Sequence, residues 1–117
     1  LGTRRDIPEL YRAMDLYVMA SVSEAASMAL LEAMAVGLPC VVTSVGGMVH
    51  LVDGGRCGRL VPPADAVALA SAIQELFFSR EERSNLGRAA RERSRSLYGR
   101  DVMLRRLESI YDEIFPL

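Results

Sequence analysis

Residues 16–43 read LYVMASVSEAASMALLEAMAVGLPCVVT, and this stretch decides the fold. It begins with an apolar run, residues 16–20, whose spacing is not helical and whose flanks are polar, which predicts a buried strand. After a polar loop, Ser27 precedes a nearly all-apolar helix that ends at Gly37. Residues 40–43, CVVT, predict a second buried strand. Strand, helix and strand in this order indicate a parallel sheet.

The flanking sequence extends this pattern in both directions. Upstream, Asp6 is expected to cap a short helix that runs to about Met14. Downstream, the sequence predicts a helical turn over residues 48–52, a third short strand over 58–61, and two prolines that stop it. The C-terminal third is predicted to be helical, with Asp65 capping one helix, Ser79 capping a second over about 80–97, and a third over 100–115. The fold class is therefore α/β, with a helical C-terminal tail.

Composition narrows the possible functions. The chain has 117 residues, half of them hydrophobic, which suits one globular domain. Its 14 positive charges are all Arg, against 15 Asp and Glu, and the net charge of −1 does not favour binding to nucleic acid. The arginines between residues 80 and 106 are spread around several helical faces and indicate a solvated surface. The absence of Lys excludes a Schiff-base mechanism or a P-loop lysine within this chain. No apolar run reaches the ~18 residues of a membrane span.

The Cys and His residues point to no metal or redox site. Cys40 and Cys57 lie in apolar or glycine-rich surroundings without metal-ligand spacing, and we interpret them as reduced thiols of an intracellular protein. His50 is the single histidine, and we interpret it as a surface or packing residue and not as a catalytic base.

A candidate binding site lies where the first strand meets the apolar helix. Glu24 follows the strand, and the helix begins with the backbone amides of Ser27, Met28 and Ala29, which can bind an anion. Glu32 lies on the second turn, with its side chain tilted back toward the helix N-terminus, so we expect two carboxylates to flank one pocket. A carboxylate can accept two hydrogen bonds from a vicinal diol, which suits a nucleotide sugar. The alternative is that both glutamates are only helix-capping or solvated side chains.

Three blocks of sequence resemble glycosyltransferase family 4. They are DIPELYRAMDLYVMAS (6–21), SEAASMALLEAMAVGLPCVVTSVGG (23–47) and VDGGRCGRLVPPADAVALASAI (52–73). The resemblance implies the second half of the C-terminal, donor-binding, Rossmann-like domain of a GT-B fold, a three-layer parallel sheet that is incomplete here. Within this single partial domain, residues 1–63 would form the strand and helix half of the nucleotide-sugar site and residues 64–117 the C-terminal helices. The acceptor site would belong to an N-terminal domain outside this chain, so the fragment alone is expected to be inactive.

The resemblance also implies roles for individual residues. Glu24 matches the glutamate that contacts the transferred sugar, and Glu32 matches the one that binds the ribose hydroxyls. The amides of Ser27, Met28 and Ala29 match the diphosphate-binding helix start. Transfer in this family retains the anomeric configuration and uses no side-chain nucleophile, so that stabilisation of the leaving diphosphate is the main catalytic contribution. The sequence contains no Asp-x-Asp, and neither a metal nor a cofactor is expected beyond a UDP- or GDP-sugar donor.

One departure from the family pattern keeps alternatives open. Ala25, Ala26 and Ser27 stand where the family usually has Gly-Phe-Gly, and alanine restricts both backbone conformation and close approach of a sugar. The expected function is transfer of a hexosyl group to a glycan, lipid-linked or small-molecule acceptor in polysaccharide biosynthesis. The expected location is the cytoplasm, with peripheral contact at the inner face of the membrane left open. The alternatives are a non-catalytic GT-B relative that acts as an interaction module, and a sugar-nucleotide epimerase.

Overall fold

The computed structural model describes residues 2–114 and has the α/β fold that the sequence predicts. Three parallel strands form one sheet in the order β1-β2-β3, with Val18 opposite Val41 and Val41 opposite Arg59. The elements in chain order are α1 (Ile7–Ala13), β1 (Tyr17–Met19), α2 (Met28–Ala35), β2 (Cys40–Thr43), α3 (Met48–Leu51), the 3-10 turn η1 (Asp53–Gly55), β3 (Arg59–Val61), α4 (Ala66–Phe78), α5 (Arg80–Tyr98) and α6 (Arg100–Ile114). The predicted end of the last helix at residue 115 lies outside the described residues.

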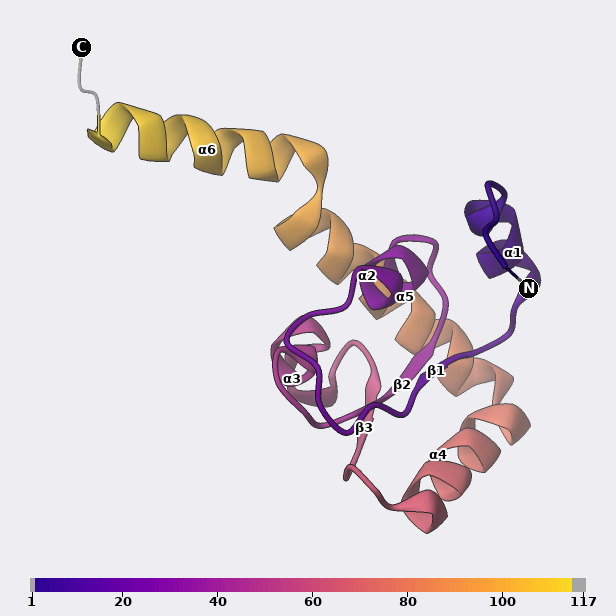
Figure 1. Ribbon diagram of the computed structural model, residues 1–117. Helices are drawn as coiled ribbons and strands as arrows, with labels where there is room; N and C mark the ends of the chain where they lie inside the picture. The colour runs from indigo at the N-terminus through magenta and orange to yellow at the C-terminus, as the bar shows by residue number, and fades with distance from the viewer. Residues whose placement is uncertain (1, 115–117) are drawn as a thin grey trace.

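The core has two parts, one on each face of the sheet. Side chains alternate along β2, so that Cys40 and Val42 pack with α2, α3 and α5, while Val41 packs with α4. Figure 1 shows α2 and α5 crossing on one side of the strands and α4 lying on the other. The helices and the sheet therefore form three layers, as predicted.

The first strand is less buried than the sequence suggests. The prediction of a fully buried strand over residues 16–20 is wrong, because β1 spans three residues and Val18 is 39% exposed. In the described part of the chain β1 pairs only with β2, and α4 packs over β2 and β3. By contrast, all four residues of β2 are buried, as predicted.

Local capping predictions are confirmed at α4 and α5 and wrong at α1. The side chains of Ser27, Asp65 and Ser79 accept hydrogen bonds from backbone N–H groups three residues ahead. Asp6 makes no such bond at α1, because its carboxylate is taken by the guanidinium of Arg4 in a charge-assisted pair.

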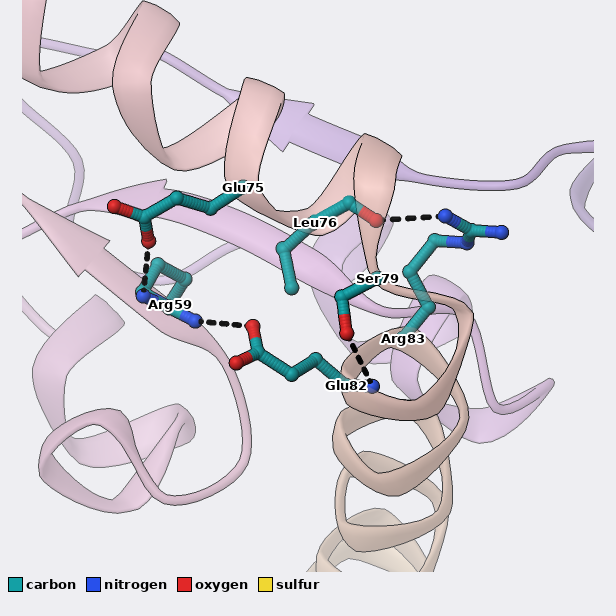
Figure 2. Close-up of polar contacts among 6 residues, drawn as sticks. All are labelled: Arg59, Glu75, Leu76, Ser79, Glu82 and Arg83. Atoms are coloured by element: carbon teal, nitrogen blue, oxygen red, sulfur yellow. Dashed lines mark hydrogen bonds and ion pairs between the residues drawn. The ribbon is translucent and has the colours of Figure 1, made fainter.

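An ion-pair cluster joins β3, α4 and α5. The Arg59 guanidinium donates to Glu75 at 2.8 Å and to Glu82 at 3.1 Å (Figure 2). At the corner between α4 and α5, Arg83 donates to the carbonyls of Leu76 at 2.7 Å and Phe77 at 2.6 Å. These contacts bind three elements together at one end of the sheet.

The last helix lies apart from the core. Figure 1 shows α6 extending from the end of α5 away from the sheet. None of its residues is buried, and one side carries exposed apolar side chains that include Leu107 and Ile110. Within residues 2–114 no helix combines the length and the apolar character that crossing a bilayer requires.

Candidate functional site

Residues 24–29 follow the carboxyl end of β1, in the loop before α2 and at the start of that helix. In an open parallel α/β sheet, this edge is where ligands bind. Two loops meet there, residues 20–27 between β1 and α2, which we call the Glu24 loop, and residues 44–47 between β2 and α3, which we call the glycine loop. The first turn of α2 completes the site.

The start of α2 has the features of an anion-binding helix N-terminus. Ser27 is 7% exposed, and its Oγ accepts a hydrogen bond from the Leu30 amide at 3.1 Å. Within residues 2–114 the amides of Met28 and Ala29 have no acceptor. The first turn contains no acidic side chain, so the positive end of the helix dipole is not neutralised locally. Two open amides and this dipole favour a bound anion such as a phosphate group.

Glu32 lies on the exposed side of α2, next to a tyrosine that sequence reasoning missed. The Tyr11 hydroxyl, on α1, lies 3.3 Å from the Ala29 carbonyl and 3.5 Å from a Glu32 carboxylate oxygen, within donating distance of either. Burial, and then the charge of Glu32, raise the pKa of Tyr11, which therefore stays protonated as a donor. The Tyr11 ring packs edge to face on Tyr17 at 6.1 Å. No motif links Tyr11 to Glu32, because 21 residues separate them in the chain.

Glu24 is half-buried in its loop, and its carboxylate forms no hydrogen bond or ion pair with the described residues. Ala25 and Ala26, which follow it, are exposed. Glu32 contributes to a shallow cavity of about 330 Å³ together with Pro8 and Val36 from α1 and the end of α2, and Glu24 does not line that cavity. A pocket flanked by both carboxylates therefore stays a prediction.

The remaining candidates fit the structural roles that the sequence indicates. His50 is exposed on α3, and its backbone carbonyl accepts a hydrogen bond from Arg93 at 2.8 Å. Cys40 and Cys57 are buried free thiols, and burial raises the pKa of Cys40 to about 12. Nowhere in the described part of the chain do three His, Cys, Asp or Glu side chains gather so as to hold a metal ion.

Comparison with known proteins assigns this chain to a family. The family described as "Glycosyl transferases group 1" matches residues 1–93, and the chain belongs to it. The N-acetyl-alpha-D-glucosaminyl L-malate synthase of Bacillus anthracis is 32% identical over 114 residues, which are 97% of this chain and 30% of the relative. The chain thus spans less than a third of that relative's length.

Solved structures agree with this assignment. A glycosyltransferase from Rickettsia africae superimposes with a TM-score of 0.90 at 29% identity, over 99% of this chain and 31% of that one. HepE from Anabaena, solved in complex with UDP, gives a TM-score of 0.86 at 27% identity, over 96% of this chain and 31% of that one. HepE has also been solved with UDP-glucose. The fold of this chain is that of the matched part of these GT-B glycosyltransferases.

Proposed function

We propose that the protein carrying this chain is a retaining family 4 glycosyltransferase that transfers a hexosyl group from a UDP- or GDP-sugar, and that this chain supplies part of the donor site. The observation that carries the proposal is the start of α2, with two open amides and no acid in its first turn. The UDP and UDP-glucose complexes of the similar HepE support a nucleotide-sugar ligand.

In this proposal each part of the site binds one part of the donor. The amides of Met28 and Ala29 receive the diphosphate, and Glu32, held beside Tyr11, accepts hydrogen bonds from the ribose hydroxyls. Glu24 contacts the transferred sugar. The dipole of α2 stabilises the charge that develops on the leaving diphosphate, and the site needs no side-chain nucleophile and no metal held by this chain.

Calorimetric titration of the full-length protein with UDP, GDP, ADP and their sugar conjugates tests the site. In the titration, Glu32→Ala is expected to weaken binding of the nucleoside diphosphate itself. Glu24→Ala is expected mainly to slow sugar transfer, which is measured as turnover. Glu81→Ala is the matched control, because Glu81 is an exposed glutamate of α5 with no ion pair among the described residues. Normal kinetics in both Glu24→Ala and Glu32→Ala would refute the site assignment.

Product analysis tests the reaction itself. Retention predicts that the first-formed glycoside has the same anomeric configuration as the donor sugar, which proton NMR of the nascent product reports directly. An inverted product would contradict the proposed mechanism. Turnover of the donor into another nucleotide sugar without acceptor would indicate the epimerase instead. The acceptor, whether glycan, lipid-linked or small molecule, is proposed to bind outside residues 1–117.

A second candidate function rests on the Glu24 loop. Ala25 and Ala26 are exposed at the place where family members usually carry glycine and phenylalanine, so a non-catalytic relative that binds a partner is the alternative. Replacing residues 25–27 with Gly-Phe-Gly distinguishes the two. If the natural protein is inactive and the Gly-Phe-Gly variant is active, the protein is a non-catalytic relative. Unchanged or reduced activity in the variant would favour a site adapted to its own donor.

A further inference from the structure

The Glu24 loop is fixed by the neighbouring glycine loop and by the end of β2. The Thr43 hydroxyl donates to the Ser21 carbonyl at 2.5 Å, and the Gly47 amide donates to the Ala25 carbonyl at 2.9 Å. One bond lies near each end of the loop, so together they hold the backbone on both sides of Glu24. These two bonds fix the Glu24 loop to the end of β2 and to the glycine loop.

Between these two bonds the backbones touch so closely that only glycine fits. A Cβ atom on Gly46 would lie 1.6 Å from the Glu24 carbonyl oxygen, and one on Gly47 would lie 2.3 Å from the Ala25 carbonyl oxygen. Real Cβ contacts essentially never fall below 3.0 Å. Gly46 also has φ +51, a conformation that side chains disfavour. Any side chain here must therefore push the Glu24 loop away.

The glycine loop itself rests on a rigid support. Gly47 precedes α3, whose Met48 and Leu51 are buried in the core. Arg93 of α5 donates to the carbonyls of His50 at 2.8 Å and Leu51 at 3.4 Å, which ties the end of α3 to α5. The position of the Glu24 loop is consequently set by the core.

We propose that Gly46 and Gly47 are positioning residues that place Glu24 against the donor sugar. This inference rests on the function proposed above. It adds that recognition of the sugar and of the nucleotide are separable. Glu32 and the open amides belong to α2, which is anchored in the core by its own residues Leu30 and Met34. A shift of the Glu24 loop should thus impair sugar transfer and leave the affinity for the nucleoside diphosphate unchanged.

Alanine substitutions in the full-length protein test the proposal against a matched control. Gly54 has φ +63 and no atom within 4 Å of its added Cβ, so Gly54→Ala shares the backbone strain of Gly46→Ala without the collision. We expect Gly46→Ala and Gly47→Ala to lower kcat/KM for the sugar nucleotide about 100-fold, since a misplacement of about 1 Å can have this effect. Their Kd for the nucleoside diphosphate should stay close to that of Gly54→Ala.

A second pair of variants keeps the proposal testable if the alanine variants fold poorly. Thr43→Val removes the donor to Ser21 at nearly constant volume, while Thr43→Ser keeps it. Thr43→Val should therefore lower kcat, and Thr43→Ser should keep it close to the wild-type value. The inference would be overturned, and the proposed function left standing, by either of two results. One is a kcat/KM of Gly46→Ala equal to that of Gly54→Ala, and the other is an equal loss of affinity for the nucleotide and for the sugar nucleotide. A wild-type protein that binds no nucleotide would overturn the proposed function, and the inference with it.

Discussion

Substitution of Gly87 by alanine should destabilise the protein, although alanine has the higher helix propensity and Gly87 lies within α5. Gly87 lies in α5 where that helix crosses the turn between α2 and β2, and an added Cβ would lie 2.2 Å from the Gly37 carbonyl oxygen. Ordinary contact begins at 3.4 Å, so the two backbones must separate by 3.4 − 2.2 = 1.2 Å. Because the obstacle is backbone, no rotamer change can relieve it.

The magnitude follows from two opposed effects. Alanine is about 1 kcal/mol better than glycine inside a helix. Overpacking a tight contact costs about 1–3 kcal/mol, and a rigid carbonyl places this contact at the upper end. The expected net loss is about 2 kcal/mol of unfolding free energy, since the second effect exceeds the first by about that amount.

Urea unfolding followed by circular dichroism measures this loss. Ser84→Ala is the control, because Ser84 is exposed on the same helix and gains the same kind of propensity without a collision. Ser84→Ala should be as stable as wild type or slightly more so. A Gly87→Ala protein as stable as wild type would refute the argument that α5 meets the turn after α2 through backbone contact at this glycine.

Three further predictions concern the core, the ion pairs and a helix cap. Burial raises the pKa of Cys40 to about 12, so the stability that the neutral thiol contributes is fully present below pH 9, the ordinary thiol pKa, and is lost as the pH rises toward 12. The pH dependence of the unfolding free energy should therefore differ between wild type and Cys40→Ala only in that window. Arg59→Met should cost about 1 kcal/mol through its pairs with Glu75 and Glu82, and unfolding in 1 M salt should shrink that difference, whereas a salt-independent cost would point to packing. Asp65→Ala should cost about 1 kcal/mol by removing the α4 cap while Asp65→Asn retains most of it, and equal melting temperatures of the two variants would contradict this.

Features decided by neighbouring residues could be predicted from the sequence. Residues 40–43 form β2 as predicted, because an apolar, largely β-branched run between Pro39 and Ser44 has few other conformations open to it. The caps at Ser27 and Asp65 also follow from local chemistry. The cap at Asp6 failed because a second local partner, Arg4, competes for the same carboxylate.

Features that depend on distant contacts could not be predicted in this way. The exposure of Val18 follows from which strands α4 covers, and the sequence of β1 does not contain that information. Likewise, the contact of Gly46 with the Glu24 carbonyl joins residues 22 apart, and no local pattern at either residue indicates it. That Glu24 and Glu32 act on one donor molecule stays a prediction.

The corner between α4 and α5 has a consequence for how the protein opens. Ser79 ends α4 through its amide, which donates to the Leu76 carbonyl at 3.3 Å, and begins α5 through its hydroxyl. Arg83 of α5 in turn donates to the Leu76 carbonyl (Figure 2) and to the Phe77 carbonyl near the end of α4. Because neither helix end can fray without breaking the other's bonds, the last turn of α4 and the first turn of α5 should exchange their amide hydrogens as one cooperative unit. Hydrogen exchange would then report a single opening free energy across a junction where two helices meet.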